Sequence, residues 1–150
     1  MHSELLVQAE RWLAQDPDPQ TRQELQNLIN ANDDEHNHEL TDCFAGRLQF
    51  GTAGLRGKLG PGPNRMNRVV VMQAAAGLAA YITQHHPHAA SIVIGYDARY
   101  NSDVFAADTA AIMQGAGVNA LVLPRPLPTP VLAYAIKHLG TSAGVMVTAS

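Results

Sequence analysis

Apolar residues recur every three or four positions in the first third of the chain, which is typical of helices with one apolar face. The run Asp16-Pro17-Asp18-Pro19 separates two such stretches. A third stripe consists of Leu40, Phe44 and Leu48. We predict a helical lead-in over residues 1–46, with Trp12 in its core and no chemistry of its own. The other apolar positions of the first two stretches are Leu5, Leu6, Ala9, Leu13, Leu25, Leu28 and Ile29.

Short apolar runs alternate with longer helical stretches in the rest of the chain. Strands are predicted at 92–96, 119–123 and 144–147, and helices at 67–86, 103–115 and 131–138. Asn67 is the expected cap of the first of these helices, and Ser102 or Asn101 that of the second. This alternation predicts βαβ units with right-handed crossovers. The fold class is therefore α/β, with a mixed, mostly parallel sheet between helices over residues 47–150. A further strand is expected near 47–50. Its direction relative to the sheet is left open, with an antiparallel strand at the edge of the sheet as one possibility.

Composition narrows the class of protein. With 150 residues, one domain with a real core is expected. Charged residues make up 15%, so another domain or subunit covers part of the surface, or the core is large. A net charge of −3 without a basic run gives no case for nucleic acid, and Cys43 as sole cysteine excludes an internal disulfide. The N-terminus lacks a signal peptide and the apolar segment 69–82 is too short to span a membrane, so we expect a cytoplasmic protein.

The segment 50–65 differs from the rest because it holds five glycines, two prolines and three basic residues. Glycines let the backbone approach a ligand closely, and exposed N–H groups beside arginines form anion sites. Arg56 is suited to bidentate contact with phosphate. The spacing fits neither a nucleotide P-loop nor the dinucleotide fingerprint. An ordinary flexible loop with solvated charges is the alternative.

The carboxyl ends of parallel strands meet at one edge of a sheet, where open α/β sheets place their ligands. Asp97 and Arg99, the loop carrying Thr129, and Ser150 are therefore expected to gather there, with Arg56 able to complete the group. An acid, a hydroxyl and arginines suit phosphate handling. Taken alone, the hydroxyls would be loop groups bonded to nearby backbone. The histidines 36, 38, 85, 86 and 88 are interpreted as surface residues and not as metal ligands.

Four motifs together resemble, in chain order, the first domain of the α-D-phosphohexomutases. They span about two-thirds of the chain. The lead-in with Trp12 and the segment Arg65-Met66-Asn67 are most similar to the branch of phosphoglucomutase-2-type and phosphopentomutase enzymes, whose bacterial members are often labelled phosphomannomutases. The four motifs are Phe50–Gly57, Asp97-Ala98-Arg99, Pro128-Thr129-Pro130 and Thr148-Ala149-Ser150.

The resemblance implies a four-domain phosphoserine enzyme, an isomerase that acts by intramolecular phosphotransfer in carbohydrate metabolism. Ser150 would carry a phosphoryl group and donate it to a hexose or pentose phosphate, giving a sugar bisphosphate intermediate. Arg56 would lie near the transferring group, with Thr52 in the same motif and Arg99 also binding phosphate. Mg²⁺ would be held by an acidic loop of the second domain together with an oxygen of the phosphorylated Ser150. No general base is identified in the sequence.

The sequence departs from the family pattern because it ends at Ser150, where the family continues His-Asn-Pro and then the metal loop. Asp97 and Asp103 are too isolated to replace that loop. We expect a fragment whose catalysis belongs to the parent enzyme and which alone neither binds Mg²⁺ tightly nor completes a turnover. A non-catalytic phosphate- or nucleotide-binding module is the alternative. A purely structural interaction domain is a third reading, which leaves the arginine loop unexplained.

Overall fold

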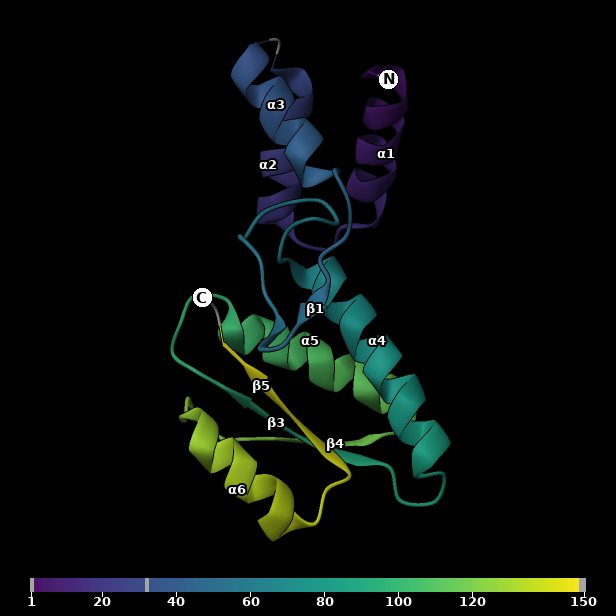
Figure 1. Cartoon of the computed structure of the whole chain (residues 1–150), viewed down its shortest axis with the longest axis vertical. Coiled ribbons are helices and arrows are strands. Elements are labelled where there is room, and N and C mark those ends of the chain that lie inside the picture. The colour runs from purple at the N-terminus through teal and green to yellow at the C-terminus, as the bar shows by residue number, and fades with distance from the viewer. Residues whose placement is uncertain (1, 32, 149–150) are drawn as a thin grey trace. The chain divides into compact units, whose positions relative to one another are not determined.

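The computed structural model describes residues 2–31 and 33–148, which form two compact units that meet in sequence at Val70. The first unit contains the helices α1 (His2–Gln15), α2 (Pro19–Asn30) and α3 (Asp34–Cys43), seen in Figure 1. It also contains a two-stranded hairpin, β1 (Phe50–Gly51) and β2 (Gly54–Leu55). The helix α4 (Arg68–His85) begins in this unit and continues into the second.

Aspartates start the second and third helices. Asp18 accepts the backbone N–H of Gln20 at 2.9 Å, and Asp33 accepts that of His36 at 2.9 Å. Each carboxylate satisfies a donor that the first helical turn leaves open. The nearly buried Asp16 accepts the hydroxyl of Thr21 at 2.6 Å. The run of aspartates and prolines therefore separates α1 from α2, as predicted.

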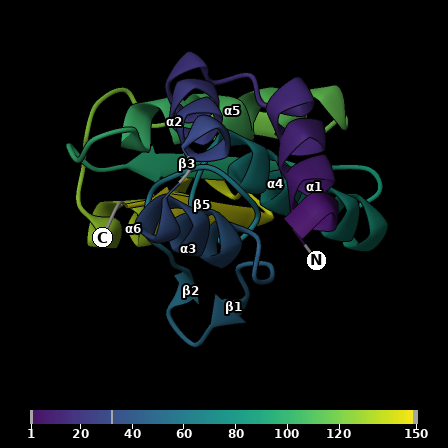
Figure 2. The same ribbon diagram turned by 90° about the horizontal axis from the view of Figure 1, so that it is seen from above.

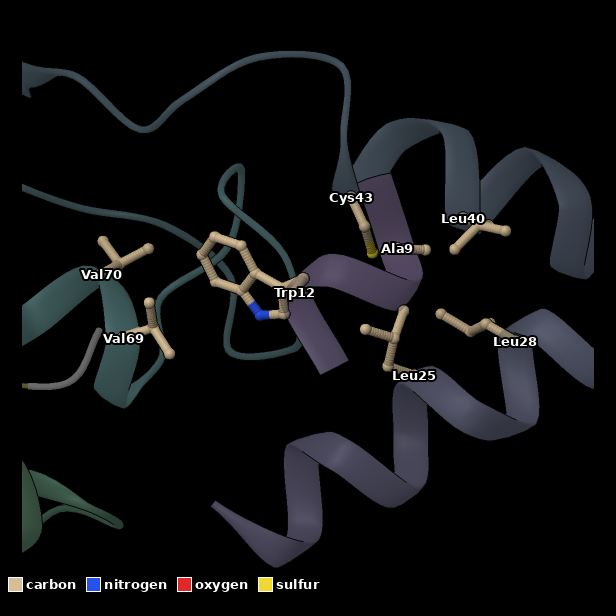
Figure 3. Packing of buried hydrophobic residues seen from close by; sticks show 8 residues of the cluster. All are labelled: Ala9, Trp12, Leu25, Leu28, Leu40, Cys43, Val69 and Val70. Atoms are coloured by element: carbon tan, nitrogen blue, oxygen red, sulfur yellow. The ribbon is translucent and has the colours of Figure 1, made fainter. Parts of the chain in front are cut away.

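A single apolar cluster holds the first unit together, and Figure 3 shows its buried members. The ring of Trp12 meets that of Phe44 edge to face, with 6.3 Å between centroids. Such pairs add about 0.5–1.5 kcal/mol beyond the area they bury. Both residues are core residues, as predicted. Leu48 does not extend the third helical stripe, because α3 ends at Cys43 and the N–H of Leu48 bonds to the carbonyl of Pro63.

The second unit is built on a three-stranded parallel sheet in the order β4-β3-β5. Its strands are β3 (Ser91–Tyr96), β4 (Asn119–Val122) and β5 (Ala143–Val147). The parallel directions and the strand positions, to within one residue at each end, are as predicted. The short antiparallel pair β1–β2 is a separate hairpin. The α/β class, with a mixed and mostly parallel set of strands, is confirmed.

Helices cover both faces of this sheet. The helices α5 (Ser102–Gly115) and α6 (Thr129–Leu139) lie on opposite sides of β3 and β5 in Figures 1 and 2. Alternate residues of β3 face opposite ways. Ile92 and Ile94 pack with α4 and α5, whereas Val93 packs with Leu132 of α6 and its neighbours. The chain steps from β3 to β4 and then back across β3 to β5, which requires helices on both faces when crossovers are right-handed.

One helix start differs from the prediction. Thr129, expected in the rigid loop, is the first residue of α6, because Pro130 fits the first helical turn, where its missing N–H costs nothing. Asn101, one of the two residues predicted to cap α5, occupies the cap position with φ of 65°, and its side chain forms no capping bond. Asn67 caps α4 as predicted and accepts the N–H of Val70 at 3.0 Å. No helix in the described ranges is long and apolar enough to cross a membrane.

Candidate functional site

The carboxyl edge of the parallel sheet brings three loops together. The N–H of Asp97, just past β3, donates to the carbonyl of Val147 at the end of β5 over 3.2 Å. The N–H of Leu127 donates to the carbonyl of Tyr96 over 3.0 Å, which brings the proline-rich loop to the same edge. Strand order reverses direction between β3 and β5, the point at which open α/β sheets bind ligands.

The carboxylate of Asp97 organises this edge. Its Oδ1 accepts the hydroxyl of Ser102 at 2.7 Å and the backbone N–H of Arg99 at 3.1 Å. Burial acts to raise the pKa of Asp97, but the bonds from Ser102, Arg99 and Thr148 together outweigh it and hold the pKa below its ordinary value. Asp97 is therefore an ionised acceptor at neutral pH.

Arg99 lies beside this carboxylate at the surface. Its Nε is 3.6 Å from Oδ2 of Asp97, and its side chain is 59% exposed. Exposed ion pairs of this kind contribute little to stability.

The glycine-rich segment of the first unit begins with the β1–β2 hairpin, whose turn is Thr52–Ala53. Gly54 has φ of +101°, a conformation that favours glycine. Thr52 and Arg56 are both exposed, and the guanidinium of Arg56 forms no hydrogen bond or ion pair within the described part of the chain. Lys58 pairs with Glu39 over 3.3 Å, and both side chains are exposed.

The third basic residue of this segment is structural. Arg65 is nearly buried, and its guanidinium contacts Oδ2 of Asp42 at 2.6 Å. This hydrogen bond and the charge of Arg65 lower the pKa of Asp42. Nη1 of Arg65 also donates to the carbonyl of Asn64 at 3.3 Å. Arg65 is one of the three basic residues of the glycine-rich segment. Its guanidinium stabilises this segment by binding Asp42 and Asn64.

The predicted site residues divide among three parts of the chain. Thr52 and Arg56 belong to the first unit, and Arg99 belongs to the second. Ser150 lies outside the described residues. The shared pocket for Arg56, Arg99 and Ser150 therefore stays a prediction, and Thr148 is the described residue nearest in sequence to the serine.

Sequence reasoning missed the partners of Asp97. The pattern predicts Ser102 or Asn101 as the helix cap, but the fully buried hydroxyl of Ser102 bonds to Asp97. The signal that could have revealed it is a serine five positions after an aspartate that ends a buried strand, at the start of the next helix. The bond from the N–H of Asp97 to the carbonyl of Val147 follows from the pairing of β3 with β5, which the alternation of elements alone does not specify.

The described residues do not form a magnesium site. They contain no group of three histidine, cysteine or acidic side chains placed to hold an ion. The carboxylate of Asp97 is already engaged by the hydroxyl of Ser102 and the backbone N–H of Arg99. A divalent ion would need several oxygen ligands from elsewhere.

Comparison with known proteins identifies the family. The model of the phosphoglucomutase/phosphomannomutase α/β/α domain I matches residues 47–150. A probable phosphoribomutase of Schizosaccharomyces pombe is 41% identical over 94% of this chain and 24% of its own length. The phosphopentomutase of Mus musculus is 36% identical over 100% of this chain and 25% of its own. A probable phosphomannomutase of Haemophilus influenzae is 68% identical over 57% of this chain and 17% of its own.

A crystal structure from Thermus thermophilus, described provisionally as a phosphomannomutase, matches with a TM-score of 0.61 and 27% identity. It is matched over 67% of this chain and 22% of its own length. The chain thus spans a quarter or less of the length of these relatives. Relatives named phosphoribomutase and phosphopentomutase are matched over nearly the whole chain, the lead-in included. The model of domain I matches residues 47–150, and the chain belongs to the phosphoglucomutase/phosphomannomutase family, in its phosphopentomutase-like branch.

Proposed function

We propose that this chain is the catalytic-serine domain of a sugar-phosphate mutase. The parent enzyme would interconvert the 1-phosphate and 6-phosphate of glucose or mannose, or the 1- and 5-phosphates of a pentose. Ser150 would carry the phosphoryl group. The observation that carries the proposal is the bond from the N–H of Asp97 to the carbonyl of Val147, which brings the ends of β3 and β5 together at the carboxyl edge of the sheet, in a chain that matches domain I of this family.

In the first step, the hydroxyl of the bound sugar phosphate would attack the phosphorus carried by Ser150. The bond from phosphorus to Oγ of Ser150 breaks as the bond to the sugar oxygen forms, and the sugar hydroxyl gives its proton to a base. The resulting sugar bisphosphate turns over and returns its other phosphoryl group to Ser150. Positioning and charge neutralisation supply most of the rate in such reactions.

Two arginines of this chain are suited to neutralise the charge of the phosphoryl group. Arg56 is exposed and unengaged within the described residues, so its fork of donors is available to a phosphate. Arg99 lies at the carboxyl edge of the sheet, where it pairs with Asp97. Mg²⁺, with ligands mostly from the other domains, would add positive charge at the phosphoryl group. Those domains would also supply the sugar-recognition loop and the base.

The test uses the full-length protein. Ser150→Ala is expected to abolish mutase activity on glucose, mannose and pentose 1-phosphates, and to remove a phosphoryl adduct that intact-mass and peptide analysis assign to Ser150 in the wild type. Ser142→Ala is the matched control, since Ser142 precedes β5 at the opposite edge of the sheet and contacts Ala89 and Ser91. Activity of Ser150→Ala comparable to wild type would overturn the proposal. Direct phosphate binding without an adduct would favour a binding module instead.

A further inference from the structure

The backbone that carries Arg56 is held on both sides. Before it, Leu55 belongs to the β1–β2 hairpin and packs, half-buried, against the apolar cluster of the first unit. After it, the carbonyl of Lys58 accepts the N–H of Met66 at 2.8 Å. Arg56 and Gly57 alone lie between these two attachments, so the main chain at Arg56 has little freedom although its side chain is exposed.

Gly57 lies directly against the side chain of Leu48. A Cβ built on Gly57 would lie 2.7 Å from Cδ1, 2.8 Å from Cδ2 and 3.3 Å from Cγ of Leu48, and these are the nearest atoms outside its own chain neighbours. The φ of Gly57 is not in the left-handed region. The close contact with Leu48, and not backbone strain, is therefore what opposes a side chain at this position.

Leu48 is itself fixed to the first unit. Its side chain is half-buried and packs against the apolar cluster, and its N–H donates to the carbonyl of Pro63 over 3.0 Å. Leu48 thus offers a fixed apolar surface on which the main chain at Gly57 rests, one residue after Arg56.

The place of this main chain matters for an arginine that binds phosphate. The guanidinium makes two parallel hydrogen bonds to the phosphate oxygens, a geometry that tolerates little displacement. At a reacting centre, a misplacement of about 1 Å costs about a hundredfold in rate. A backbone that is ordered before the phosphate arrives also lowers the entropy cost of binding.

We propose that Leu48 is a positioning residue for Arg56, and that it acts through its contact with the main chain at Gly57. The inference rests on the proposed function, in which Arg56 neutralises the charge of the transferring phosphoryl group. Leu48 has no polar side-chain atom to offer a substrate. It sets how far from the apolar cluster the backbone of Arg56 lies, and hence where the guanidinium can reach.

The test starts from Gly57→Ala in the full-length enzyme, which introduces the Cβ that meets Leu48. This variant should lower kcat by about ten- to a hundredfold and leave KM within about threefold. Leu48→Val removes both Cδ atoms, so adding it to Gly57→Ala should recover most of that loss. Gly46→Ala is the matched control and should keep wild-type kcat, because a Cβ there meets nothing within 4 Å. Rates are measured well below the lowest melting temperature of the set, so that unfolding is not mistaken for slower chemistry.

A double-mutant cycle with Arg56→Ala tests whether the effect passes through the guanidinium. Arg56→Ala alone should lower kcat, and Gly57→Ala should cause no further loss in that background. A contact that served stability alone would slow both backgrounds by the same factor.

Four results would each overturn the inference. They are wild-type kcat in Gly57→Ala, no recovery when Leu48→Val is added, equal fold losses with and without the Arg56 side chain, and wild-type kcat in Arg56→Ala. All four are distinct from failure of the proposed function, which requires that Ser150→Ala retain activity.

Discussion

Asn67 holds the carbonyl of Gly60: its side-chain amide donates to that oxygen over 2.9 Å and to the carbonyl of Gly62 over 2.8 Å. The side-chain oxygen of Asn67 accepts the N–H of Val70. The residue is 2% exposed. One buried side chain therefore both starts α4 and closes the glycine-rich segment that carries Arg56.

Replacing Asn67 with aspartate separates these two roles. The Asn67→Asp side chain can still accept the N–H of Val70, but it cannot donate to the two glycine carbonyls and brings a negative charge against them. Buried acceptors left without donors cost about 1–3 kcal/mol, so we expect a loss of about 2 kcal/mol or more in the free energy of unfolding by urea. Asn27→Asp, at an exposed site on α2 where the side chain accepts from Gln23, should change stability by less than about 0.5 kcal/mol. Equal stabilities of the two variants would contradict the assigned role.

Gly62 lies in the same segment and needs to be glycine. Its φ is +91°, and a Cβ built on it would lie 2.6 Å from the carbonyl oxygen of Cys43. Both the left-handed backbone and the contact with a main-chain atom oppose any side chain, so Gly62→Ala should destabilise the protein by about 2 kcal/mol or more. Gly46→Ala is the control, because a Cβ there meets nothing within 4 Å. A melting temperature of Gly62→Ala equal to that of Gly46→Ala would show that the loop yields freely.

Sequence reasoning locates the elements of the sheet well because β-branched runs and helical periodicity are local signals. The strand ends at Tyr96 and Val147 agree with the pattern to within one residue. Two predictions are wrong: Leu48 does not lie in a helix, and Thr129 does not lie in a loop. Leu48 keeps the helical spacing although α3 has already ended, and Thr129 begins α6 although two prolines flank it.

The site can be predicted as a set of residue types, but its contacts cannot. Sequence alone suggests that Asp97 and the end of β5 share an edge, and their pairing makes them neighbours. The commitment of Arg65 to Asp42 could not be predicted, because 23 residues separate them and no local pattern links an arginine to a particular carboxylate. The meeting of Arg56, Arg99 and Ser150 remains a prediction, because the two arginines belong to different units and Ser150 lies outside the described residues.

Gly144 determines how closely β5 approaches α6. A Cβ on this residue would overlap Cδ1 of Ile136 and lie 2.9 Å from Cδ1 of Leu132. Gly144→Ala should therefore destabilise the protein by about 1–3 kcal/mol, the usual cost of overpacking. Adding Ile136→Val removes the overlapping methyl and should recover part of that loss, although Ile136→Val alone is destabilising. Chemical denaturation of the four proteins measures the coupling, and strictly additive effects would contradict the contact.

Protonation of Asp97 is expected to lower the stability of the protein at acid pH. Its folded pKa lies below the ordinary value of 3.8, so the unfolded chain takes up this proton first as the pH falls. The stabilisation that Asp97 provides is therefore complete above about pH 5 and disappears as the pH falls through the lowered folded pKa.

Ser102→Ala removes one of the hydrogen bonds that lower the pKa of Asp97 and should raise this pKa towards the ordinary value. Thr109→Val removes another buried hydroxyl of α5, which donates to the carbonyl of Phe105, and should leave the pKa of Asp97 unchanged. Carboxyl-carbon NMR titration reads the pKa directly, and a pKa that is the same in wild type and Ser102→Ala would contradict the network.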